Sequence, residues 1–447
     1  MRRVPRLALA VAIAVACAAF AGQAVAAPGA FVWKETPNPT AGNDALHLCA
    51  GGPAGAVYAA GTQGDYPDAD IWVVKYEAGG AQAWSRTWAG PDGGYDEARG
   101  MVIDAAGNVY VCGRTGPASG LGDSLLLKYD AVGALAWATV YEAGASSDEA
   151  EAIGLDAAGD IYLAGWSDAS AAATDVYTAK FRASDGVRQW TSWYSSTGSG
   201  RPRGIAVTGA GDSYVAGMSR TAAGVMDALL VKTSASGDQA WAKLWDGPQG
   251  RLDEWAAVEL APGGGVVVAG TTGSSRAGDF AAARYSSAGA QTWLRTWSSA
   301  GRWYDEVRDL AVAGDGSAWV AGATDRDEGD MRAALVKWSA AGRQMFVRPL
   351  GTRRIAAELS AITLDGDGNA YVAGSVQATG AGGGWDLLAA RYARGGSRLW
   401  FSSAGFGADS QDGFDAIALG GPGFVYACGT AGWEGPDSRG VVVKVRR

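Results

Sequence analysis

The chain has 447 residues, including 68 glycines and 19 tryptophans, and carries a net charge of −9 at pH 7. So acidic a surface repels phosphate backbones, which argues against nucleic-acid binding. The single histidine, His47, leaves almost no material for a Ser-His-Asp hydrolase or a multi-histidine metal centre. Glycine and large aromatic residues at this density favour many short strands joined by tight turns.

Residues 1–26 have the pattern of a secretory signal peptide. Arginines at positions 2, 3 and 6 precede the apolar stretch Leu7–Phe20, and Ala24-Val25-Ala26 forms a small-residue cleavage site. The apolar stretch is short for a membrane span and no later segment resembles one, so we expect no transmembrane segment. We therefore expect a secreted, periplasmic or cell-surface protein. In an alternative interpretation, Cys17 follows Ala14-Val15-Ala16 as the acceptor of a lipid anchor.

A repeat of about fifty residues runs through the rest of the chain. Its most regular segment has the form NVYVCG, DIYLAG or NAYVAG, and the copies follow one another at intervals of 52 to 55 residues. The central residues of the eight copies are Tyr58, Tyr110, Tyr162, Tyr214, Val267, Trp319, Tyr371 and Tyr426.

Each copy contains four β-like runs. In the second copy they are Glu97–Asp104, Val109–Gly113, Ser124–Tyr129 and Leu135–Tyr141. The first and second runs, and the third and fourth, are joined by tight turns, whereas the other connections are longer and differ between copies. Four antiparallel strands per repeat with this alternation predict a propeller blade. We therefore predict an all-β fold, an eight-bladed β-propeller of four-stranded antiparallel blades.

The two ends of the chain predict how such a ring closes. A glycine precedes an aromatic residue by four positions in the last turn of each copy, and the earliest instance is Gly29/Trp33. The chain ends just after the third run of the last copy, Val441–Val445. Phe31–Glu35 should therefore join the three C-terminal strands as the fourth strand and remove an open edge. Residues 27–447 form one domain in this interpretation, with blades at about 43–89, 97–142, 148–194, 202–246, 253–297, 305–350, 357–403 and 411–447 plus 31–35.

The recurring D-x-x-G-N-x-Y-V-x-G segment, followed by K-Y-D and G-x-x-x-W, resembles the bacterial β-propeller repeat family called SBBP. That resemblance covers the mature chain and implies a secreted or surface-attached propeller without one fixed activity. Asp130, Gly133 and Trp137 also resemble the docking motif of eight-bladed quinoprotein dehydrogenases. Those enzymes use adjacent cysteines, which this chain lacks, so no cofactor is expected.

The first strands of six blades carry a polar residue at or near a shared position. In related WD-repeat propellers this strand is innermost, so that resemblance implies that these side chains line a central channel. They form either a solvated wall or a small-ligand or ion site. The residues are His47, Arg99, Glu151, Arg203, Arg308 and Asp415.

The longer loops vary in length, charge and aromatic content, so a specific ligand should meet the side of the propeller that carries them. Exposed aromatic residues beside carboxylates suit a carbohydrate or a protein ligand. The candidate contact residues are Tyr66, Tyr95, Trp166, Trp303, Tyr304, Trp385 and Trp433.

No metal site and no catalytic residue is predicted. Asp365-Gly-Asp367-Gly-Asn369 resembles part of a calcium loop but aligns with the first tight turn of every blade, whereas the loop 325–330 is a weaker cation candidate. Pairs such as Asp227/Lys232 recur in the third strand and are interpreted as a scaffold polar network. Cys112 and Cys428 replace alanines of the repeat, so free thiols are expected.

These features favour a monomeric, non-enzymatic binding or scaffolding module outside the cytoplasm. Two alternatives remain at this stage. One is a propeller enzyme of the quinoprotein, lyase or glycosidase kind, and the other is an envelope assembly or docking factor.

Overall fold

The structure is a computed structural model. It describes residues 27–40, 42–117, 121–142, 147–170, 173–195, 198–221, 224–248, 252–274, 277–299, 305–325, 331–352, 355–378, 383–406, 410–432 and 437–447. The signal segment with Cys17, the loop residues 326–330, and Trp303, Tyr304 and Trp433 lie outside these ranges. Within them, no helix has the length and apolar character needed to cross a membrane.

The described residues form thirty-two strands and one short 3-10 turn, η1 (Pro53–Gly55). The strands are β1 (Phe31–Glu35), β2 (Ala45–Gly51), β3 (Val57–Gln63), β4 (Asp70–Tyr76), β5 (Gln82–Trp88), β6 (Glu97–Ile103), β7 (Val109–Thr115), β8 (Asp123–Tyr129), β9 (Leu135–Tyr141), β10 (Asp148–Leu155), β11 (Ile161–Ser170), β12 (Ala173–Phe181), β13 (Arg188–Tyr194), β14 (Gly200–Val207), β15 (Ser213–Arg220), β16 (Met226–Thr233), β17 (Gln239–Trp245), β18 (Leu252–Leu260), β19 (Val266–Ser274), β20 (Ala277–Tyr285), β21 (Gln291–Trp297), β22 (Asp305–Val312), β23 (Ala318–Asp325), β24 (Met331–Trp338), β25 (Gln344–Leu350), β26 (Ala357–Leu364), β27 (Ala370–Gln377), β28 (Trp385–Tyr392), β29 (Arg398–Ala404), β30 (Gly413–Leu419), β31 (Phe424–Ala431) and β32 (Arg439–Arg446).

From β2 to β29, each four consecutive strands form an antiparallel sheet in chain order. The sheets β14–β17 and β18–β21 are also joined by one parallel bridge, Met226 to Leu252. The remaining sheet has the order β1-β32-β31-β30, with Phe31 opposite Val445 and Glu35 opposite Val442. The pairing expected for Phe31–Glu35 is therefore present.

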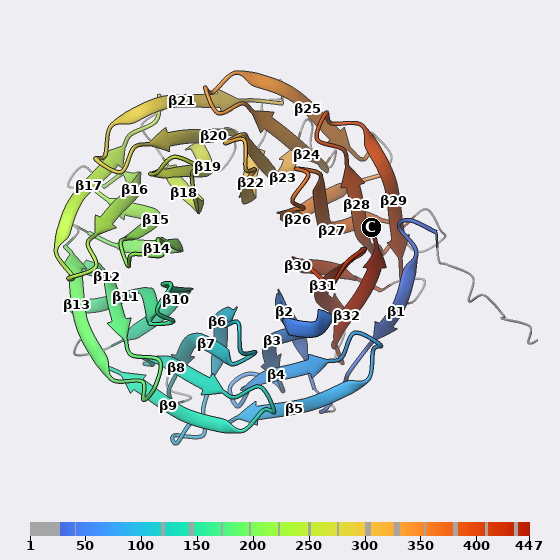
Figure 1. The fold of residues 1–447 in the computed structure, drawn as a ribbon, viewed down its shortest axis with the longest axis horizontal. Coiled ribbons are helices and arrows are strands. Elements are labelled where there is room, and N and C mark those ends of the chain that lie inside the picture. The colour runs from blue at the N-terminus through green and yellow to red at the C-terminus, as the bar shows by residue number, and fades with distance from the viewer. Residues whose placement is uncertain are drawn as a thin grey trace, which may run out of the picture.

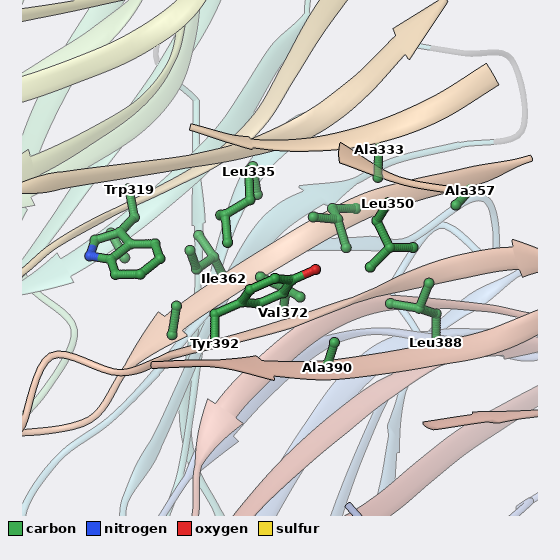
Figure 2. Packing of buried hydrophobic residues seen from close by; sticks show 14 of the residues in the cluster. Trp319, Ala333, Leu335, Leu350, Ala357, Ile362, Val372, Leu388, Ala390 and Tyr392 are labelled. Carbon is green, nitrogen blue, oxygen red and sulfur yellow. The ribbon is translucent and has the colours of Figure 1, made fainter. Parts of the chain in front are cut away.

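The sheets stand around a common centre, with the first strand of each sheet innermost and the last outermost (Figure 1). The second and third strands of a sheet are apolar along most of their length because the neighbouring sheets cover both of their faces. β8, for example, is buried at Ser124–Leu127, whereas the outer strand β9 alternates between exposed and half-buried residues. The core therefore lies between sheets, as in the cluster that Trp319, Leu335, Ile362 and Tyr392 form between β22–β25 and β26–β29 (Figure 2).

In several sheets the first tight turn is built by an aspartate. Asp104 accepts hydrogen bonds from the backbone of Ala106 and Asn108, both at 2.9 Å, and Gly107 takes the positive φ that the turn requires. Asp365 accepts the equivalent bonds from Asp367 and Asn369. The segment 365–369 is thus a turn, as the sequence predicts.

The recurrent tryptophan of each outer strand packs against the next sheet. The indole of Trp84 donates to the carbonyl of Ala131 at 3.3 Å, and Lys75 donates to the same carbonyl at 3.2 Å. Trp137 and Lys128 converge in the same way on the carbonyl of Ala183. Lys75 and Lys128 therefore reach the neighbouring sheet instead of the acid five residues before each of them, because residues five apart on a strand point to opposite faces.

The three described cysteines are free. Cys112 and Cys428 are fully buried, as expected for residues that replace core alanines. Burial raises the pKa of both thiols, and the neighbouring thiol of Cys49 raises that of Cys428 further.

Candidate functional site

A bulge in each innermost strand turns one side chain toward the centre of the molecule. The pairing of β6 with β7 shifts between Ala98 and Gly100, which sets Arg99 out of the ladder, and that of β30 with β31 shifts around Asp415. The sequence placed six residues at this position. The structure adds Ala256 and Ser360, which occupy the bulges of β18 and β26. Aligning the first strands of all eight repeats would have found them.

One side of the centre holds a channel cavity of about 390 Å³. Arg99, Glu151, Arg203 and Arg308 line it as expected. His47 lies outside the lining, and its Nε2 donates to the carbonyl of Ala98 at 2.7 Å. The predicted channel residue His47 is therefore tied to the neighbouring strand.

The arginines of the channel cavity are paired with carboxylates. Arg99 contacts Glu149 at 2.6 Å and Glu97 at 3.1 Å, and Arg308 contacts Glu306 at 3.0 Å. Arg203 and Glu254 are 3.4 Å apart. The arginines of these pairs are 39–45% exposed while their carboxylates are largely covered, so solvent reaches each pair from the arginine side and weakens the attraction. This part of the channel is a charge-balanced wall.

A second cavity, of about 480 Å³, lies where β26 and β30 meet the ends of β27 and β31 and the starts of β24 and β28. We call it the acidic cavity, since it contains two carboxylates and its described lining includes no lysine, arginine or histidine. Its lining residues are Met331, Glu358, Ser360, Ser375, Trp385, Gln411, Gly413, Phe414, Asp415 and Thr430.

The acidic cavity is rich in hydrogen-bond acceptors. Ser375 donates to Glu358 at 2.9 Å, which orients that carboxylate. The side-chain oxygen of Gln411 is buried and accepts no hydrogen bond from the described residues. Leaving a buried acceptor unpaired costs about 1–3 kcal/mol, so a ligand with a donor can recover that energy.

The position of Trp385 in this cavity is fixed through its backbone. Its N–H donates to the carbonyl of Ser410 at 3.0 Å, and its carbonyl accepts from Asp412 at 2.9 Å. The fully buried carboxylate of Asp412 in turn accepts from the backbone of Phe406 at 2.8 Å and of Gly432 at 3.0 Å. Asp412 therefore connects the three segments that form this part of the cavity wall.

Aspartates equivalent to Asp412 begin other inner strands and were missed by the sequence reasoning. Each is buried at the junction of a long loop and the first strand of a sheet, and the signal was an aspartate recurring just before that strand. They are Asp44, Asp96, Asp148, Asp253 and Asp305.

The charge of Glu358 acts on the other carboxylate of the acidic cavity. Loss of hydration between the channel walls, together with the negative charge of Glu358, raises the pKa of Asp415 to about 7, although the residue remains open to the channel. A proton therefore resides on Asp415 for much of the time near neutral pH. A bound cation would favour its ionised form.

The four predicted aromatic contact residues that the structure describes do not form one surface. Trp385 lines the acidic cavity, while Tyr66, which is 72% exposed, pairs with Tyr95 at a ring-centroid distance of 5.6 Å on the loop before β4. Trp166 was expected to be exposed, and that expectation is wrong. The Arg201 guanidinium covers its ring at 3.3 Å, and its indole donates to Glu151 at 3.2 Å.

The tight-turn side also has cavities, contrary to the expectation that it offers little to a ligand. One of about 640 Å³ is lined by Asp315, Lys337 and Arg394. Arg394 pairs with Asp315 at 2.8 Å, and Lys337 donates to the carbonyl of Arg394 at 2.9 Å. Because these charged groups already have protein partners, the acidic cavity is the stronger candidate site.

No protein-family model matches the chain, and no curated protein matches it by sequence. Among solved structures, Sqt1 of Chaetomium thermophilum bound to the N-terminus of the ribosomal protein L10 is similar with a TM-score of 0.56 and 11% identity over 92% of this chain and 98% of that one. The unbound Sqt1 gives the same TM-score with 13% identity, 92% of this chain and 98% of that one. This chain has a β-propeller fold. At these identities the likeness concerns the propeller fold alone.

Proposed function

We propose that this propeller is a non-enzymatic binding module that takes a cationic group of a protein ligand in the acidic cavity. The carrying observation is the cavity itself, where Glu358 and Asp415 face the same space as the unpartnered oxygen of Gln411. Trp385 adds an aromatic face, which attracts cations by about 0.5–2 kcal/mol. A lysine or arginine side chain, or a free amino terminus, supplies both the charge and the donors that these groups lack.

The proposed architecture has eight blades in a ring closed by β1. The strand order β1-β32-β31-β30 supports it, as does the way β1 takes the place of an outer strand. Trp33 donates to the carbonyl of Ala78 at 3.3 Å, as outer tryptophans such as Trp84 and Trp137 donate to the sheet after theirs. The channel cavity then lies at the centre of the ring, and the acidic cavity lies beside it, between the last sheets of the chain.

A protein ligand is favoured over a carbohydrate by charge. The chain has a net charge of −9, and a surface of one sign attracts partners of the other. A similar propeller, Sqt1, has been solved with the N-terminus of a ribosomal protein bound, so the fold is compatible with a peptide ligand. We further propose, from the signal-like segment 1–26 and the SBBP resemblance, that the protein acts as a monomer outside the cytoplasm.

The test is binding to an array of basic, neutral and acidic peptides, with glycans in parallel. Basic peptides should bind, and Asp415→Asn, Glu358→Gln or Trp385→Ala should weaken that binding about 10-fold, within the range of interface hot spots. Asp367→Asn removes an equal charge from an exposed turn and should leave the affinity unchanged. Affinity should also rise between pH 6 and pH 8, because Asp415 loses its proton in that range. Binding of glycans only, or equal weakening by Asp367→Asn, would overturn the proposal.

A second candidate function rests on the raised pKa of Asp415 beside Glu358. A carboxylic acid that titrates near pH 7 beside a second carboxyl group can act as a general acid–base pair, as in glycosidases. Turnover of aryl glycosides that is abolished by Asp415→Asn would favour this candidate. Peptide binding without any turnover would exclude it.

A further inference from the structure

Three carboxylates converge where the sheet β14–β17 meets the sheet β18–β21. They belong to Asp227 in β16, Asp253 in β18 and Asp246, which follows directly after β17. One oxygen of each lies within 4.8 Å of the others. We propose that Asp227, Asp246 and Asp253 bind a calcium ion that links the two sheets.

Asp227 is the residue that points to a ligand. The residue is only 8% exposed, and its carboxylate makes no hydrogen bond or ion pair with the described part of the chain. A buried ionised carboxylate without a partner is strongly unfavourable, so such groups are paired or coordinate metals. Burial raises the pKa of Asp227, and the charges of Asp246 and Asp253 raise it further. A bound divalent cation would offset both the cost of desolvating Asp227 and the repulsion among the three carboxylates.

Asp253 provides a fixed ligand. It is fully buried, and it accepts hydrogen bonds from the backbone of Gly247 at 2.8 Å and from Thr272 at 2.5 Å. These bonds fix the orientation of the carboxylate while leaving further lone pairs on both oxygens. Asp246 is exposed and adds the third charge from the solvent side.

Comparison with the equivalent boundaries between other sheets shows what is particular to the boundary between β14–β17 and β18–β21. At the next one, Ser299 donates to Asp305 at 2.7 Å as Gly247 donates to Asp253, but Ser298 stands in the place of Asp246. Glu142 occupies that place beside Asp123 and Asp148, yet that trio does not converge in the same way among the described residues. Among the residues that the structure describes, Asp246 therefore completes a three-carboxylate group at this boundary alone.

The spacing suits calcium. Calcium binds six to eight oxygens at roughly 2.3–2.6 Å, so oxygens on opposite sides of the ion can stand about 4.6–5.2 Å apart. Magnesium demands near-ideal octahedral geometry at roughly 2.0–2.1 Å, whereas calcium accepts an irregular set of carboxylates. The three oxygens lie within 4.8 Å of one another, a span that one calcium ion covers, and water would complete the shell on the exposed side of Asp246.

The experiment uses the full chain, stripped of metal with a chelator and desalted. Calcium titrated into it should bind at one site per chain by calorimetry and raise the melting temperature, and terbium at this site should show luminescence sensitised by Trp245, the neighbour of Asp246. Asp246→Ser, which installs the residue of the next boundary, should fold normally and bind calcium at least 10-fold more weakly. Glu142→Gln is the matched control and should bind as the native chain does.

Three results would overturn the assignment. The first is a native chain with neither heat nor a shift in melting temperature on calcium addition. The second is an Asp246→Ser variant that retains native affinity, and the third is tighter binding of magnesium than of calcium. A peptide-binding failure at Asp415 would leave this site untouched, since the two lie on different sheets.

Discussion

At the scale of single residues, the glycine of the G-x-x-x-W pattern acts on a different tryptophan from the one beside it in the sequence. Gly133 precedes Trp137 by four residues, but a Cβ added to Gly133 would stand 2.7 Å from the ring of Trp84 on the preceding sheet. The same relation joins Gly80 to Trp33. The spacing recurs because every sheet both offers a tryptophan to the next sheet and receives one.

This contact predicts the cost of adding one methyl group. Gly133 and Gly159 both have positive φ, at 82° and 85°, but nothing lies within 4 Å of a Cβ at Gly159. Both substitutions to alanine should cost about 1 kcal/mol for backbone strain. Gly133→Ala should lose roughly a further 1–3 kcal/mol, because Trp84 must move out of its packed position. Urea unfolding measures both, and equal losses would contradict the role of the Trp84 contact.

At the scale of elements, β1 completes a sheet whose other three strands come from the opposite end of the chain. The backbone of Gly29 donates to the carbonyl of Arg446 at 2.8 Å, and Ser402 of the preceding sheet donates to the carbonyl of Gly29 at 2.6 Å. The N-terminal segment therefore contacts two sheets.

Deleting residues 27–36 should leave β32 with an open edge. Unpaired strand edges promote association with other chains, so we expect a lower melting temperature and large species in size-exclusion chromatography. Trp33→Ala retains the pairing with β32 and should remain monodisperse with a smaller loss of stability. Adding the 27–36 peptide in trans should partly rescue the deletion. A deletion variant as soluble and heat-stable as the native chain would argue against ring closure.

At the scale of the whole molecule, several carboxyl groups lie near the centre, where their surroundings raise their pKa values and so disfavour the charged form. The confined channel and the charge of Asp309 raise the pKa of Glu259 to about 7. Burial raises the pKa of Asp309 to about 6, although its carboxylate accepts hydrogen bonds from Leu310 and Ile362, both at 2.8 Å. Asp415 and Glu358 form a comparable pair in the acidic cavity.

These shifts set a pH dependence of stability. An unfolded glutamate titrates near pH 4.3, so between about pH 4 and pH 7 the folded chain holds protons that the unfolded chain has released. Stability should therefore fall as pH rises through that window and stay low above it. Glu259→Gln should have a higher melting temperature than the native chain at pH 8 and the same one at pH 4. Asp92→Asn, in an exposed loop, should show no such difference. A Glu259→Gln gain that is equal at both pH values would contradict the assigned shift.

The sequence alone determined the strands and turns, because these depend on contacts within one repeat. The predicted runs Glu97–Asp104 and Leu135–Tyr141 correspond to β6 and β9, and the aspartate turns are formed as expected. The residues that the bulges turn inward could also be predicted from the sequence, because they occupy one position of the repeat.

Only the tertiary structure decided which residues from different repeats come together. The sequence predicts Trp166 to be an exposed loop aromatic, but the guanidinium of Arg201 from the next sheet covers its ring. Asp415 and Trp385 share a cavity although they lie on different sheets. Asp227 and Asp246 look like an ordinary strand acid and loop acid, and only the approach of β16 to β18 adds Asp253 to them. The spacing of residues within one repeat specifies its strands and turns, whereas contacts between neighbouring sheets create the sites that differ from one repeat to the next.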